Sequence, residues 1–89
     1  MRTIIKHANR RLYDAKEGRP ITLLELSELV LCGEQISVRD KVTDRDITAV
    51  ALIQSVLEHV RRRPAGGMAA AEAERIVAAL RSAIVVTEN

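Results

Sequence analysis

The chain has 89 residues, of which 47% are hydrophobic and 29% are charged, and its formal net charge is +2. This size and composition suit one small folded domain and exclude an intrinsically disordered chain. Tyr13 is the only aromatic residue, which excludes recognition of single-stranded nucleic acid by several stacking rings. No apolar run is long enough for a membrane span, and we expect no signal peptide and no membrane partner.

Chain length and cysteine content also set expectations for location and assembly. Cys32 is the single cysteine, so no internal disulfide forms and a reducing cytoplasm is expected. A chain this short buries a modest core, and without a disulfide or a metal it usually gains stability by oligomerisation. We therefore expect a homo-oligomer.

Charge is segregated along the sequence. Residues 1–20 hold six basic and two acidic residues, residues 21–60 hold three and seven, and residues 61–89 hold five and three. Two basic ends therefore flank an acidic middle. This pattern predicts either a basic surface that meets phosphate or ordinary solvated faces.

The N-terminal third of the chain predicts two strands, at residues 3–7 and 12–14, joined by a turn at residues 8–11. Gly18 and Pro20 predict a loop over residues 14–20. A first helix follows, because Thr22 and Glu25 form a capping box and Gly33 offers a C-terminal stop. Residues 36–40 alternate between apolar and polar side chains, as a half-buried strand does.

Residues 47–62 predict the second helix, which Asp44 or Asp46 caps. Its expected buried stripe is Ala49, Leu52, Ile53, Val56, Leu57 and Val60. The opposite face is expected to carry Thr48, Ser55, Glu58 and Arg62.

Residues 64–67 predict a Pro/Gly hinge, and residues 68–84 a third helix. This helix carries a weak heptad seam. The seam consists of Ala69, Ala73, Ile76, Leu80 and Ala83. Such a narrow apolar face should pack on a neighbouring chain or fold back on its own domain, and we assign oligomerisation to Ala73, Ile76 and Leu80. The predicted fold class is α+β, a small β-β-α-β-α domain with an antiparallel sheet, followed by the C-terminal helix.

The sequence offers little support for a catalytic site or a metal site. His7 and His59 have no carboxylate nearby in the sequence, and Cys32 has no neighbouring histidine and is interpreted as a buried small hydrophobe. Cys and His lack metal-ligand spacing, and the aspartates at 40, 44 and 46 lack the calcium-loop pattern. We expect no enzyme activity, no metal and no cofactor.

The basic groups remain as candidates for function. Asn9, Arg10 and Arg11 occupy the predicted turn, flanked by Lys6 and Tyr13, where guanidinium groups reach phosphates or guanine edges unless the turn is simply solvated. A second cluster ends the second helix, where cations also complement the helix dipole. It consists of Arg61, Arg62 and Arg63.

The segment from Lys6 to Asp14, KHANRRLYD, resembles the opening signature of the DNA-binding N-terminal domain of polyhydroxyalkanoate (polyhydroxybutyrate) accumulation regulators, which reads roughly KYPNRRLYD. The likeness continues in register to about Leu57. This sequence departs from the family pattern at His7, Ala8, Ile36 and Asp44, the last of which replaces a turn glycine.

The resemblance implies a bacterial, oligomeric DNA-binding regulator, with Lys6, Asn9, Arg10, Arg11 and Tyr13 as functional positions. It divides the chain into a regulator-like domain, residues 1–63, and a hinge with an oligomerisation helix, residues 64–89. Repression of storage-polymer genes and a nucleoid-associated location are further implications. Two alternatives remain: a protein-interaction adaptor on the same fold that does not bind DNA, and a structural role in which Asp14 pairs with Arg10 or Arg11.

Overall fold

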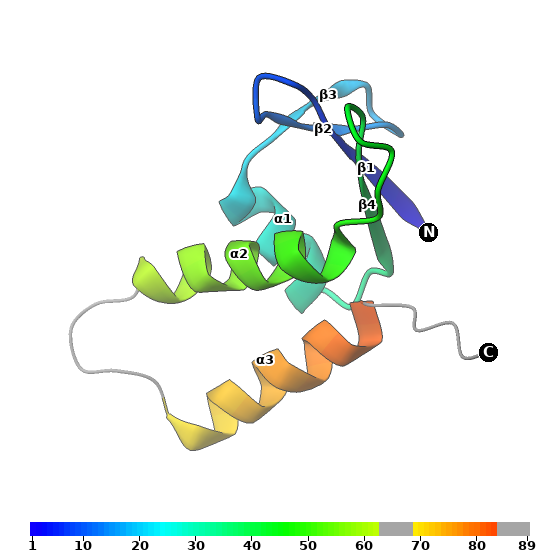
Figure 1. Cartoon of the computed structure of the whole chain (residues 1–89). Helices are drawn as coiled ribbons and strands as arrows, with labels where there is room; N and C mark the ends of the chain where they lie inside the picture. Colours follow the sequence, from blue (N-terminus) through cyan, green and yellow to red (C-terminus); the bar gives the residue numbers. More distant parts are fainter. Residues whose placement is uncertain (63–68, 84–89) are drawn as a thin grey trace.

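The computed structural model describes residues 1–62 and 69–83, which form a four-stranded sheet with helices packed on one side of it (Figure 1). The predicted hinge at residues 64–67 lies outside these described residues. No helix in the described ranges is long and apolar enough to cross a membrane. The elements are β1 (Arg2–Lys6), β2 (Leu12–Asp14), β3 (Arg19–Ile21), α1 (Leu23–Leu31), β4 (Ile36–Asp40), α2 (Thr48–Arg61) and α3 (Ala70–Ala83).

The sheet is mixed, whereas an antiparallel sheet was predicted. Its strand order is β3-β2-β1-β4, and β2 pairs antiparallel with both β1 and β3. β4 runs parallel to β1, with Ile4 opposite Val38. The connection explains this direction. α1 joins β3 to β4 and returns the chain to the end of the sheet where β1 begins, so β4 runs in the same direction as β1.

The two edges of the sheet differ. β3 forms one edge, and its first two residues fall in the segment predicted as a loop because of Pro20; an edge strand tolerates a proline, since its outer side needs no N–H donor. The loop after β4 covers the other edge, where the Asp40 N–H donates to the Arg45 carbonyl and the Ile47 N–H to the Val38 carbonyl, both at 2.9 Å.

Both ends of α1 match the sequence prediction. The Thr22 hydroxyl accepts a hydrogen bond from the Glu25 N–H, and the Glu25 carboxylate accepts one from the Thr22 N–H, each at 3.1 Å. Gly33 ends the helix with a φ of +86°, a left-handed conformation that glycine adopts without steric cost. Its N–H donates to the Val30 carbonyl at 3.0 Å.

The buried face of α2 differs from the predicted one. Thr48 and Ser55 were expected in solvent and are buried. The Ser55 hydroxyl donates to the Leu52 carbonyl at 2.7 Å, so it needs no water. The helix carries apolar residues on two faces, and its periodicity does not say which face meets the sheet. The residues predicted to be buried but found exposed are Ala49, Ile53 and Leu57.

Thr48 fixes this orientation by joining the start of α2 to β4. Its hydroxyl accepts a hydrogen bond from the buried Val38 N–H at 2.9 Å and donates to the Asp46 carboxylate. The Thr48 N–H donates to the same carboxylate at 2.9 Å, so Asp46 caps the first turn although the N-cap residue is Ile47. Both bonds lower the pKa of Asp46, and the bond from the Thr48 hydroxyl has the larger effect.

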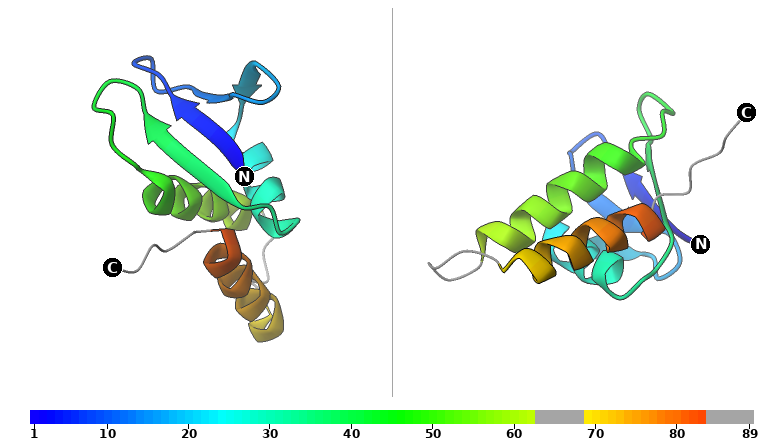
Figure 2. Two further views of the ribbon diagram at one scale, coloured as in Figure 1. Left: turned by 90° about the vertical axis from the view of Figure 1, so that its right-hand side faces the viewer. Right: turned by 90° about the horizontal axis from the view of Figure 1, so that it is seen from below.

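The core lies between the sheet and the helices, and α3 packs against α1 and α2 on the side away from the sheet (Figures 1 and 2). Ile76 and Ala83 of α3 are buried in this core, and Leu80 packs at its edge, whereas Ala73 is half-buried. The heptad seam of α3 therefore folds back on its own domain, which is one of the two arrangements expected from the sequence.

Arg2 ties the beginning of β1 to two other segments. Its Nη1 lies 2.8 Å from Asp14 Oδ2, and its Nε lies 3.2 Å from Glu34 Oε2. The Asp14 side chain is only 3% exposed. The alternative in which Asp14 pairs with Arg10 or Arg11 is therefore wrong, because the β-strand register places Arg2 beside this carboxylate instead.

We expect Thr48→Val to lower the free energy of unfolding by about 1–3 kcal/mol, because it leaves the buried Val38 N–H without an acceptor. Thr43→Val is the matched control: its hydroxyl accepts from the Arg45 N–H at 3.4 Å in an exposed turn. Water can replace that bond, so a change within about 0.5 kcal/mol is expected. Urea unfolding measures both, and equal losses would contradict the role of Thr48.

Stability should fall in acid, because hydrogen bonds lower the pKa of Glu25, Glu34 and Asp46 below ordinary values of 4.5, 4.5 and 3.8. The donors are the Thr22 N–H, the Arg2 guanidinium and the Thr48 hydroxyl, in that order. Below the ordinary values the unfolded chain binds more protons, so stability is complete above them and is lost as the pH falls through the lowered values.

Unfolding in urea at a series of pH values between 7 and 3 measures this loss. Glu34→Gln should make the profile shallower, because glutamine does not titrate. A wild-type profile that stays flat down to pH 3 would contradict the prediction.

Candidate nucleic-acid interface

The turn between β1 and β2 presents the two central arginines. The His7 N–H donates to the Arg11 carbonyl and the Arg10 N–H to the His7 carbonyl, both at 2.9 Å. The Asn9 side-chain oxygen accepts from the Arg11 N–H at 3.0 Å, a local bond that asparagine commonly makes in turns. Arg10 has a φ of +65°, a left-handed conformation that is strained for a residue with a side chain.

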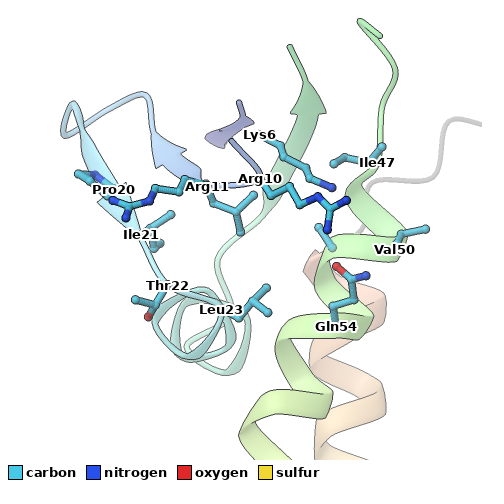
Figure 3. Close-up of a pocket in the computed structure, with 12 residues that line it drawn as sticks. Lys6, Arg10, Arg11, Pro20, Ile21, Thr22, Leu23, Ile47, Val50 and Gln54 are labelled. Carbon is cyan, nitrogen blue, oxygen red and sulfur yellow. The ribbon is translucent and has the colours of Figure 1, made fainter. Parts of the chain in front are cut away.

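A groove of about 370 Å³ lies between this turn, the junction of β3 with α1, and the first half of α2 (Figure 3). Lys6, Arg10 and Arg11 contribute to its lining, and no acidic residue does. Figure 3 shows Arg10 extending toward α2 and Arg11 extending the other way, toward Pro20. The apolar part of the lining includes Ile21, Leu23, Ile47 and Ala51.

The three groove cations are unpaired within the described part of the chain. Neither the Lys6 ammonium nor the guanidinium groups of Arg10 and Arg11 make an ion pair or hydrogen bond to a described residue. Arg19, by contrast, pairs with Glu17 and Glu25. Unpaired guanidinium forks keep all their donors for an external anion such as phosphate.

The other two residues predicted to contact DNA in this region, Asn9 and Tyr13, lie outside the groove lining. Asn9 shapes the turn through the bond to the Arg11 N–H. Tyr13 follows the groove residue Leu12 in β2, and successive side chains of a strand point to opposite faces of the sheet. Its ring contacts the His7 ring in a tilted arrangement, with 4.3 Å between centroids and 59° between the ring planes. The structure thus brings Lys6, Arg10 and Arg11 together in the groove, whereas Tyr13 lies on the face of the sheet that the helices do not cover.

The second basic cluster lies at the far end of α2. This helix has 14 residues, so its ends are about 20 Å apart. Arg62 Nε lies 3.1 Å from Glu58 Oε1, and Arg61 is exposed. Arg63 lies outside the described residues. Within one chain, this cluster is therefore separate from the groove.

Two polar groove residues, Thr22 and Gln54, were not predicted from the sequence as part of a site. Thr22 was assigned only to the helix cap. Gln54 lies one helical turn after Val50, which also lines the groove, and this i, i+4 spacing was the available signal. Cys32, predicted to be buried, is exposed at the C-cap of α1. Among the described residues, no group of three or more His, Cys, Asp or Glu side chains could hold a metal ion.

The sequence of this region matches a known protein family. Residues 3–63 match the family described as the PHB/PHA accumulation regulator DNA-binding domain. The chain belongs to this family. The resemblance found in the KHANRRLYD segment is thereby confirmed. The match runs from the second residue of β1 past the end of α2 and includes all three groove cations, whereas α3 lies outside it.

Two similar proteins share about two thirds of this chain. One, from Allochromatium vinosum, is called an uncharacterized protein and is 46% identical over 57 residues, which cover 64% of this chain and 37% of that protein. The other, from Thiocystis violacea, is called an uncharacterized protein in the phbA 5′ region and is 42% identical over 57 residues, covering 64% and 41%. The chain thus spans less than half the length of these relatives. No solved structure matches it.

The strain at Arg10 leads to a stability prediction. Arg10→Gly and Arg10→Ala remove the same cation, but glycine adopts a φ of +65° without the steric cost that alanine keeps. We expect the glycine variant to be more stable than the alanine variant by about 1 kcal/mol. Thermal unfolding measures the difference, and an alanine variant as stable as the glycine variant would contradict a left-handed conformation at this position.

Proposed function

We propose that this chain is a repressor-like, DNA-binding transcriptional regulator module of bacteria that acts as an oligomer, with Lys6, Arg10 and Arg11 contacting DNA. The observation that carries the proposal is the groove, where three cations lack partners among the described residues and no lining residue is acidic. Membership of a DNA-binding domain family supports the same function.

The arrangement of the two arginines suggests how the contact works. Arg10 and Arg11 extend in different directions from one turn (Figure 3), so they suit two different phosphates along a backbone. A planar guanidinium binds phosphate, or the O6 and N7 atoms of guanine, through two parallel hydrogen bonds. Asn9 acts by holding the turn. This role places the chain in the cytoplasm, on the nucleoid.

The family description and the name of the Thiocystis violacea relative favour genes of polyhydroxybutyrate metabolism as targets. A role in storage-polymer accumulation is accordingly part of the proposal.

A second candidate function is a protein-binding adaptor that does not contact DNA. The apolar part of the groove favours it, because Ile21, Leu23, Ile47 and Ala51 suit the apolar side chains of a protein ligand better than phosphate. The two functions differ in one measurable respect: only DNA binding weakens steeply with salt through counterion release.

We expect the purified protein to bind duplexes from a random-sequence library, with affinity that falls as salt rises. Loss of one phosphate contact reduces the slope of log affinity against log salt by about 0.9. Arg10→Gly combined with Arg11→Ala should therefore weaken binding and reduce the slope by about 2. The measurement is fluorescence anisotropy across a salt series, followed by sequencing of the selected duplexes.

Arg75→Ala is the matched control, because it removes one exposed cation of α3 that does not line the groove. It should leave the slope unchanged. Folded wild-type protein that binds no duplex at low salt would contradict the regulator function and favour the adaptor.

A further inference from the structure

The outer face of α2 carries no charge over more than two turns. All exposed positions between Thr48 and Glu58 hold uncharged side chains, namely Ala49, Val50, Ile53, Gln54 and Leu57. Val50 and Ile53 are each 58% exposed and Leu57 is 54% exposed, and we call these three residues the apolar stripe. In a chain with 29% charged residues, large apolar side chains exposed at neighbouring helix positions indicate an interaction surface.

The apolar stripe continues the groove along α2. Val50 belongs to both, because it lines the groove together with Lys6 and Arg10. Figure 3 shows Arg10 extending toward α2, where Val50 and Gln54 lie. A ligand longer than the groove therefore runs from the groove cations onto the apolar stripe. DNA accounts for the cations, but a phosphate backbone has no apolar side chains to pack on the stripe.

Cations stand at both ends of the apolar stripe. At the groove end they are Lys6, Arg10 and Arg11, which are unpaired among the described residues. At the other end Arg61 follows Leu57 by one helical turn, is exposed, and makes no ion pair or hydrogen bond to a described residue. Val50 and Arg61 are about 16 Å apart along the helix axis, so a ligand of that length meets both groups of cations.

The carboxylates near the stripe are already engaged within the chain. Asp46 accepts hydrogen bonds from Thr48, and Glu58 Oε1 lies 3.1 Å from Arg62 Nε. Asp44 pairs with an arginine of β4. The charges left free along this surface are therefore positive, and charge complementarity selects an acidic ligand over a basic one.

The spacing of the stripe indicates the shape of the ligand. Val50, Ile53, Leu57 and the half-buried Val60 follow one another at intervals of three, four and three residues. Side chains with this spacing interlock with those of a second helix that lies along the first. An amphipathic helix placed on an apolar surface is a common mode of peptide recognition.

The described helices of this chain do not meet these requirements, so a second copy is not the best occupant. α1 contains Glu25 and Glu28 but packs its apolar face in the core through Leu26 and Val30. α2 and α3 carry charges of both signs and end in basic turns. The ligand that fits is a helix of another protein.

We propose that the apolar stripe and the groove together bind an acidic amphipathic helix of another protein, and that this helix and DNA exclude each other. The apolar side chains of the helix pack on the stripe, and its carboxylates pair with Arg10 at one end and Arg61 at the other. Exclusion follows because both ligands use the groove cations. The exclusion rests on the proposed DNA-binding function, whereas the binding of the helix does not.

The first test measures binding of a labelled synthetic peptide by fluorescence anisotropy without DNA. The peptide is about four helical turns long, with leucines at intervals of three and four and glutamates at the flanking positions. It should bind saturably. Peptides with lysine in place of glutamate, or serine in place of leucine, should bind at least about tenfold more weakly. Equal binding of either comparison peptide, or no saturable binding of the acidic one, would overturn the proposal.

The second test assigns the binding to the stripe. Ile53→Gln combined with Leu57→Gln should weaken peptide binding about tenfold or more. This double variant should leave DNA affinity unchanged, because neither residue lines the groove. Val77→Gln is the matched control, since Val77 is 47% exposed on α3, and it should bind the peptide as the wild type does. Undiminished binding by the double variant, or an equal loss in the control, contradicts the assignment, and circular dichroism verifies that the variants fold.

The third test measures competition on a labelled duplex. The acidic peptide should displace the duplex from the wild type, and the same concentration should not displace it from the double glutamine variant. A ternary complex of protein, duplex and peptide would refute mutual exclusion. Peptide binding with no DNA binding would refute the proposed function and the exclusion but not the helix site, so the two failures are distinguishable.

Sedimentation equilibrium tests the other occupant of the stripe. The mass of the wild type and that of the double glutamine variant should agree. An oligomer that dissociates in the double variant would show that a second copy covers the stripe, and would overturn the proposal.

Discussion

The hydroxyl of Thr48 is the contact on which the functional surfaces of this fold depend. It satisfies the N–H of Val38 in β4 and, together with the Thr48 N–H, holds the carboxylate of Asp46. These bonds fix the rotation of α2 about its own axis, so Leu52 and Ser55 face the core and Ile53 faces solvent. For the same reason the beginning of α2 forms one wall of the groove.

The distribution of ion pairs explains why a chain of low net charge carries a cationic groove. Arg2 and Arg19 lie near the opposite end of the sheet from the β1–β2 turn and pair with the carboxylates there, including Asp14 and Glu34. The turn itself brings Arg10 and Arg11 forward with no carboxylate in the groove lining. Counting charges along the sequence hides this separation, since it is produced by strand register.

The sequence predicted most local features, because they depend on neighbouring residues. The capping box of α1, its glycine stop, the first two strands and the strand at residues 36–40 all follow from local patterns. Asp44 is a local departure with a visible consequence: it has a φ of +57° where the family signature has a turn glycine. The direction of β4, the edge strand at Pro20 and the inward face of α2 depend on contacts distant in sequence. Hydrophobic periodicity does not predict such contacts. It also counts a serine or threonine as solvent-facing even where the buried hydroxyl is hydrogen-bonded within the protein.

The groove could be predicted only in part for the same reason. Lys6, Arg10 and Arg11 were recognisable from one short segment, but Gln54 and Ile47 reach the groove through tertiary packing. Tyr13 belongs to the same segment as the arginines and still points to the other face of the sheet, because strand alternation outweighs proximity in sequence.

Neither edge of the sheet is a good template for strand addition between copies of this chain. The edge strand β3 has only three residues and contains Pro20, which has no N–H to donate, and the loop that follows β4 already occupies hydrogen-bonding groups of the other edge. Strand addition between molecules would continue from one molecule to the next without end and lead to fibres. With strand addition disfavoured, helix surfaces are the part of the molecule left for contacts between copies, and a twofold pair of helices closes after two subunits. A chain built in this way resists open-ended strand association even where many copies lie close together.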